Sequence, residues 1–126
     1  MHYLAVFIGG GVGAATRHAV NRAALAWLGP GFPWGTLIVN VIGGLLMGAL
    51  AQLFLIRTGL GQEVRLLLST GLLGGFTTFS AFSLDSALMW QRGEWTPLLL
   101  YVAGSVLLSI AALFAGMAAV RTALGA

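Results

Sequence analysis

Residues 71–83 read GLLGGFTTFSAFS and lie inside the third of four long apolar stretches of the chain. Paired glycines and β-branched threonines are poor helix formers. A helix that breaks at membrane depth frees carbonyl groups, which attract a cation, and N–H groups, which attract an anion. The stretch therefore predicts a membrane helix with a functional break. A plainer interpretation is that the glycines allow close helix packing and the hydroxyls bond to their own helix.

The composition around this stretch excludes several classes of protein. Of 126 residues, 59% are hydrophobic and 7% are charged, whereas a soluble domain carries about 25% charged residues. The basic residues are six scattered arginines, so the clustered basic face of a nucleic-acid-binding protein is missing and no nucleic acid is expected as a partner. The chain has no cysteine, which excludes disulfides, thiolate catalysis and metal sites built on cysteine.

The apolar stretches predict four transmembrane helices in one domain that covers residues 1–126. Each is long enough for the roughly 20 residues that a bilayer requires. The predicted spans are approximately 3–27, 34–56, 64–90 and 97–120. The first is the weakest, because polar residues interrupt its second half. The fold class is thus an all-α membrane protein whose third helix is broken in mid-membrane.

The arginines bear on how the chain inserts, because arginine bias between the two sides sets the orientation of a membrane protein. With four spans, three arginines lie on each side of the membrane. One set is Arg57, Arg65 and Arg121; the other is Arg17, Arg22 and Arg92. A chain without preference can insert both ways, and four helices alone seldom enclose a pathway. We therefore expect an antiparallel homodimer. A fixed orientation, with short loops that simply carry few charges, is the alternative.

Aromatic and hydroxyl residues alternate after the predicted break. Phe79 and Phe82 are spaced i,i+3 and share a helix face, and they interleave with hydroxyls that include Thr78 and Ser83. The edge of a phenylalanine ring is electropositive. Rings presented edge-on, with hydroxyl donors beside them, could therefore line a path for an anion.

Two other spans offer polar groups that match this path. Asn40 stands among aliphatic residues of the second span, and its amide is a donor without charge. It could equally bridge two helices, since a buried amide is costly unless it is paired. In the fourth span Tyr101, Ser105 and Ser109 are spaced by four, which gives one polar stripe along the helix.

The titratable residues leave little room for catalysis or proton coupling. Asp85 is the only acid expected within a span and could serve a proton-coupled antiporter; it could otherwise pair with Arg17 or Arg22, or face the interface. The two histidines, His2 and His18, form no metal site, and none is placed to activate a serine. We do not expect an enzyme.

Together these residues resemble the small fluoride channels of the CrcB (Fluc) family, over the whole chain. The match is carried by Gly9-Gly10 through Gly13-Ala14 to Arg17 and by Gly35-Thr36-Leu37 with Asn40 and Gly43. It is carried above all by residues 74–80, GGFTTFS, followed by Phe82 and Ser83. Ala81 stands where threonine is common in the family, and Asp85 where glutamate is common.

The resemblance implies an antiparallel dual-topology homodimer with two fluoride pores, which exports fluoride across the plasma membrane of a microbe as a resistance function. It further implies a sodium ion at the dimer centre, held by the backbone carbonyls of Gly74 and Thr77. The pore residues that it implies are Phe79, Phe82, Asn40, Tyr101, Ser105 and Ser109.

Neutral donors suit such a pore, because fixed positive charge would bind fluoride too tightly for it to leave. Two other functions compete with a passive channel. A small dual-topology proton-coupled antiporter would need a membrane-embedded acid, and here only Asp85 could supply one. A membrane assembly factor that transports nothing has no specific residue in its favour.

Overall fold

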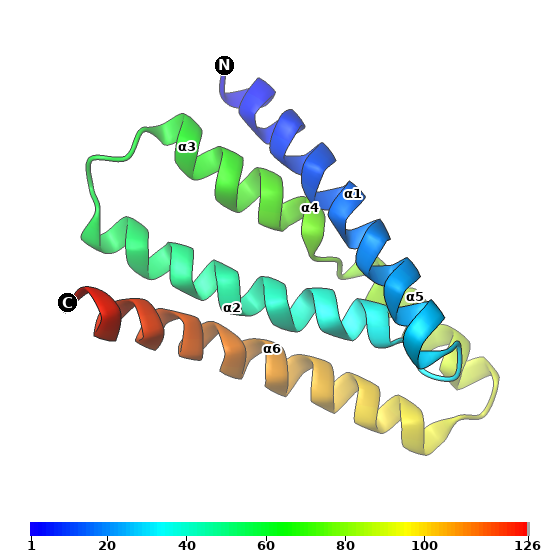
Figure 1. Cartoon of the computed structure of the whole chain (residues 1–126). Helices are drawn as coiled ribbons and strands as arrows, with labels where there is room; N and C mark the ends of the chain where they lie inside the picture. Colours follow the sequence, from blue (N-terminus) through cyan, green and yellow to red (C-terminus); the bar gives the residue numbers. More distant parts are fainter. Residues whose placement is uncertain (126) are drawn as a thin grey trace.

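The computed structural model describes residues 1–125, and these form helices joined by short loops (Figure 1). The prediction of an all-α chain is confirmed for this range. The helices are α1 (His2–Leu28), α2 (Trp34–Ile56), α3 (Gln62–Leu66), the π-helical segment η1 (Leu67–Leu73), α4 (Gly74–Phe76), α5 (Ser80–Gln91) and α6 (Trp95–Leu124). The segments α3, η1 and α4 follow one another without a loop.

Three parts of the chain are long and apolar enough to cross a membrane: Trp34–Ile56, Gln62–Gln91 and Trp95–Leu124. Helix α1 has 27 residues, about 40 Å at 1.5 Å per residue, which is also long enough. It falls below the others in hydropathy because Arg17, His18 and Arg22 lie in its second half. Three spans are therefore supported by length and composition, and a fourth stays a prediction.

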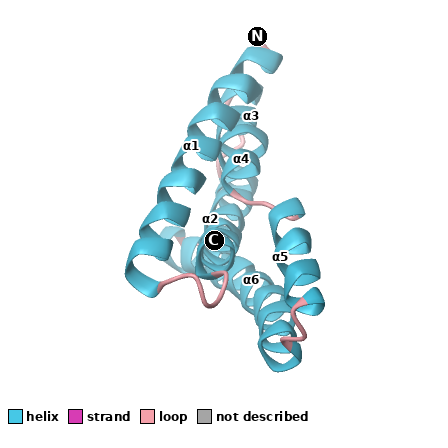
Figure 2. Cartoon of the chain, turned by 90° about the vertical axis from the view of Figure 1, so that its right-hand side faces the viewer, coloured by secondary structure: helices cyan, strands magenta, loops and turns pink. Residues whose placement is uncertain are grey.

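The third candidate span is interrupted in its middle. Helix α4 ends at Phe76, Thr77 adopts the extended conformation (φ −88°, ψ 161°), and helix α5 begins at Ser80. Figure 2 shows the connecting loop and α5 set apart from the line of α3 and α4. The interruption lies within the quoted stretch, one residue after its paired glycines.

Glycines set how closely the helices pack. A Cβ at Gly48 would collide with the carbonyl oxygen of Leu113, and one at Gly116 with that of Leu45. The backbones of α2 and α6 therefore approach closely at these glycines, and Figure 1 shows the two helices running side by side. The small core beside them is formed by Val39, Leu73 and Phe76.

The chain ends and loops gather at two sides of the molecule. The N-terminus, the α2–α3 loop and the C-terminal end of α6 lie away from the α1–α2 and α5–α6 loops (Figure 1). The four tryptophans flank the second side: Trp27, Trp34, Trp90 and Trp95. Trp90 and Trp95 meet edge to face with ring centroids 4.5 Å apart. Tryptophan in these positions is typical of a membrane interface.

Candidate functional site

A groove of about 430 Å³ runs between α2, the break and helices α5 and α6. Most of its polar and aromatic lining was predicted from the sequence as pore-forming. These residues are Asn40, Thr78, Phe79, Phe82, Ser105 and Ser109. They come from four different segments of the chain, so the fold brings them to one place. Aliphatic side chains such as Met47 and Leu113 complete the wall.

Asn40 lies at the break and bonds to both backbone groups of one residue. Its Nδ2 donates to the carbonyl oxygen of Thr78 at 3.0 Å, and the Thr78 N–H donates to its Oδ1 at 2.9 Å. The amide thus stands in for the backbone partners that Thr78 loses when the helix ends, which a buried peptide group requires. The sequence left open whether Asn40 donates into a path or bridges two helices, and in this structure it forms the bridge.

Ser105 and Ser109 do not bond in the way that five other hydroxyls of the chain do. Thr16, Ser69, Thr77, Ser83 and Ser86 each donate to the carbonyl four residues earlier, the usual way in which a helix satisfies a hydroxyl.

The Oγ atoms of Ser105 and Ser109 are buried and have no hydrogen-bond partner among the described residues. Leaving a buried polar group unpaired costs about 1–3 kcal/mol. Two such groups, one helical turn apart along the groove, can therefore bind a polar guest.

The two phenylalanines line the groove at different depths. Phe79 is 77% exposed, whereas Phe82 is half-buried. Their ring centroids are 5.6 Å apart with planes tilted by 49°. The far side of Phe82 packs on Tyr101, at 5.1 Å between centroids. Both rings line the groove, and the edge of a phenylalanine ring is electropositive.

Tyr101 and Ser83 do not line the groove. The fully buried Tyr101 donates its hydroxyl to Oδ2 of Asp85 at 2.9 Å, and Thr36 donates to the same oxygen at 2.8 Å. Ser83 is exposed and bonds back to the carbonyl of Phe79. Of the predicted polar stripe on the fourth span, two serines face the groove and the tyrosine faces Asp85.

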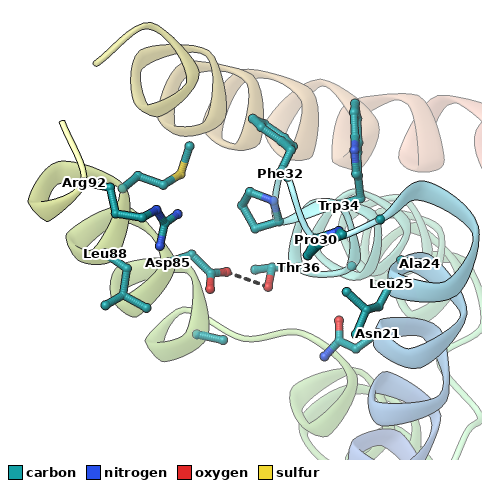
Figure 3. Close-up of a pocket in the computed structure, with 16 residues that line it drawn as sticks. Asn21, Ala24, Leu25, Pro30, Phe32, Trp34, Thr36, Asp85, Leu88 and Arg92 are labelled. Atoms are coloured by element: carbon teal, nitrogen blue, oxygen red, sulfur yellow. Dashed lines mark hydrogen bonds between the residues drawn. The ribbon is translucent and has the colours of Figure 1, made fainter. Parts of the chain in front are cut away.

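Asp85 forms no ion pair with Arg17 or Arg22; within residues 1–125 the one salt bridge joins Arg92 to Glu94. The carboxylate borders a second cavity, of about 410 Å³, below the α1–α2 loop (Figure 3). Sequence reasoning named Thr36 only as part of the second-span motif and gave it no role, whereas in the structure its side chain is buried, at 7% exposure, and bonded to Asp85. The available signal was its position four residues before Asn40, on the same face of α2.

The break also leaves carbonyl oxygens without partners. Among the described residues, no N–H or O–H donates to the carbonyl of Gly74 or of Thr77, since Thr78 N–H turns to Asn40 and Ala81 N–H to the Thr78 hydroxyl. Uncharged oxygens of this kind suit a hard cation such as sodium. The predicted donors therefore fit the ion chemically. No cluster of His, Asp or Glu in residues 1–125 could hold a metal instead.

Comparisons with known proteins show the family of the chain. Residues 4–117 match the family model described as "CrcB-like protein, Camphor Resistance (CrcB)". A protein of Rhodopseudomonas palustris (strain BisB5) named "Fluoride-specific ion channel FluC" is 54% identical over 121 residues, which cover 96% of this chain and 98% of that protein. A protein of Nitrobacter hamburgensis named "Fluoride-specific ion channel FluC 2" is 51% identical over 96% of this chain and 98% of its own length.

Proposed function

The chain belongs to the CrcB-like protein family, and we propose that it is a fluoride-selective ion channel that lets fluoride leave the cell passively across the plasma membrane. It is a channel and not an enzyme. The observation that carries the proposal is the pair of buried, unpaired hydroxyls of Ser105 and Ser109, which share a groove with the rings of Phe79 and Phe82.

The groove suits a small anion that holds its water tightly. Hydroxyl donors and ring edges replace part of that water, and no arginine or lysine lines the groove. Interactions without formal charge bind the ion weakly enough to release it, as conduction requires. In this pathway the rings of Phe79 and Phe82 meet fluoride by their edges, while Ser105 and Ser109 donate to it.

Asn40, Tyr101, Thr78 and Ser83 complete the proposed set. Asn40 and Thr78 both line the groove. Asn40 gives one Nδ2–H to the carbonyl of Thr78, and its second N–H is left to donate to the ion. Tyr101 acts as the wall behind Phe82. Ser83 belongs to the exposed face of α5, from which it would reach a path shared with a second subunit.

The proposed assembly has four spans in each subunit, α1 included, and two subunits. Thr70, Gly74, Phe79, Ser80 and Ser83 are exposed in the single chain. Exposed hydroxyls and backbone at membrane depth are costly against lipid, so a second copy should cover this face. The even division of arginines supports an antiparallel arrangement, which would also place tryptophans at both interfaces.

A sodium ion at the centre of this dimer is part of the proposal. The carbonyls of Gly74 and Thr77 from both subunits would hold it, and the ion would supply a fixed positive charge that ties the two breaks together. Support comes from the lack of hydrogen bonds to these two oxygens within residues 1–125.

Fluoride efflux from liposomes that contain only the purified chain tests the function. A passive channel carries net charge, so efflux should need a potassium gradient with valinomycin as the electrical shunt. It should not respond to an imposed pH gradient, and chloride should not follow. Absence of efflux, with empty liposomes as the blank, would remove the proposal.

Asp85→Asn separates the channel from a proton-coupled antiporter. Both hydrogen bonds to Asp85 end on Oδ2, and the amide oxygen of asparagine can accept both. We therefore expect the fold and most of the fluoride flux to survive in the channel. An antiporter that used this carboxylate would lose transport completely while still assembling.

A further inference from the structure

Helix α1 reaches the break through a line of residues spaced by four. A Cβ at Gly9 would collide with the carbonyl of Leu67, and one at Gly13 with that of Leu72. The backbones of α1 and η1 are therefore in direct contact. The next residue on this face is Arg17, which lies against the end of α4.

The guanidinium of Arg17 holds a backbone carbonyl at this point. Its Nε donates to the carbonyl oxygen of Gly75 at 3.0 Å, in a half-buried position. Within residues 1–125 its remaining N–H groups make no hydrogen bond, and no carboxylate pairs with it. The last carbonyls of a helix carry partial negative charge and require donors, so Arg17 satisfies one that the break has orphaned.

Arg17 and Asn40 thus clamp the break from two helices. Arg17 holds the carbonyl of Gly75, and Asn40 holds both backbone groups of Thr78. The carbonyls of Gly74 and Thr77 each precede a clamped residue and are themselves not bonded. The hydrogen bonds to Gly75 and Thr78 therefore fix the backbone in a conformation that leaves the carbonyls of Gly74 and Thr77 free for an ion.

We infer that Arg17 is a positioning residue for the break, and that it acts through its Nε–H bond to Gly75 and not through its positive charge. A positive charge beside a cation site weakens cation binding by Coulomb repulsion, so charge alone would work against the proposed sodium ion. The effect on the sodium ion rests on the proposed function. The ordering of the break rests on the hydrogen bond between Arg17 and Gly75.

Two substitutions separate the hydrogen bond from the charge. In Arg17→Gln the amide nitrogen is the same number of bonds from Cα as Nε, so the donor is kept and the charge removed. In Arg17→Met the terminal methyl takes that place, so both are removed. Arg22→Met is the matched control, because it removes one charge from the same helix and, as predicted, the same side of the membrane.

Hydrogen exchange of the amides in residues 77–81 measures the order of the break directly. We expect Arg17→Met to speed exchange in this segment by roughly tenfold or more, the loss of about one hydrogen bond. Arg17→Gln and Arg22→Met should stay near the parent protein. The thermal midpoint of the parent protein should be higher in sodium chloride than in N-methylglucamine chloride. This difference should persist in Arg17→Gln and Arg22→Met and shrink in Arg17→Met.

Equal behaviour of Arg17→Gln and Arg17→Met would overturn the inference, because the donor would then be irrelevant. If Arg17→Met does not fold, Arg17→Gln decides alone: exchange as fast as in a variant without Asn40, such as Asn40→Ala, refutes it. Fluoride efflux of the parent protein is measured beside these. If the parent protein shows no fluoride efflux, the proposed function is refuted. The hydrogen-exchange result still tests the role of Arg17.

Discussion

The exposed ring of Phe79 and the half-buried ring of Phe82 are the side chains most closely tied to the proposed path. Phe79→Ile and Phe82→Ile keep apolar bulk but delete the electropositive ring edge. We expect fluoride flux to fall by more than about tenfold, which is about 1.4 kcal/mol of barrier. Expression and dimer assembly should be unchanged.

Packing residues would respond differently to the same two changes. A swap between apolar side chains of similar size typically costs under about 1.5 kcal/mol of stability, and flux would persist. Near-normal efflux from liposomes with either variant would return that phenylalanine to a structural role.

The unpaired hydroxyl of Ser109 gives a prediction in which stability and transport separate. Its Oγ is buried without a partner, so Ser109→Ala removes a polar group that the fold does not satisfy. The thermal midpoint of the purified protein should stay or rise, while fluoride flux falls several-fold.

Ser86→Ala is the matched control for this serine. The Ser86 hydroxyl bonds to the carbonyl of Phe82 at 2.8 Å and does not line the groove. Its removal should leave flux unchanged. A lower midpoint for Ser109→Ala with normal flux would mean that the serine packs and does not conduct.

Helix α1 packs closely on η1 because its contact face carries glycines, where a side chain would not fit. Gly13→Ala puts a Cβ into the carbonyl of Leu72, whereas Gly11→Ala, on the same helix, meets nothing within 4 Å. Alanine gains about 1 kcal/mol over glycine in helix propensity. Gly11→Ala should therefore hold or raise the thermal midpoint, and Gly13→Ala should lower it.

Fluoride efflux adds a second readout for the same pair. Pushing α1 away from η1 also moves Arg17 off Gly75, so Gly13→Ala should reduce flux as well as stability. Equal midpoints for the two variants would show that α1 does not pack backbone to backbone on η1.

For the whole molecule, the even arginine distribution predicts insertion in both orientations. Reporters fused to the C-terminus should be found on both sides of the membrane. A lysine added beside Arg57 or Arg121 should shift the distribution towards that end facing the cytoplasm. A single orientation that ignores the added charge would contradict the antiparallel dimer.

Orientation and function can be tested together. If a variant biased to one orientation is inactive alone, a partner biased to the other should restore fluoride efflux when both are expressed. Failure of the mixture, with each chain present in the membrane, would argue for a subunit that conducts without an inverted partner.

The sequence by itself determined the class of the protein. A chain that is 59% hydrophobic and 7% charged cannot cover a soluble fold, and residues 74–83 carry the family resemblance that the comparisons establish. It also predicted six residues that the groove collects. Spacing pointed to Phe79 with Phe82 and to Ser105 with Ser109, because residues three and four apart share a helix face. Asn40 stood out as an amide among aliphatic residues, and the family resemblance assigned these residues to one pore.

Only the tertiary structure decided which polar groups form hydrogen bonds within the chain and which have no partner. Tyr101 turns to Asp85, Asn40 closes on Thr78, and Ser105 and Ser109 keep unpaired hydroxyls. Spacing along one helix cannot show this, because each partner comes from another helix. Whether a buried donor is free depends on the groups within hydrogen-bonding distance, and packing alone brings those together.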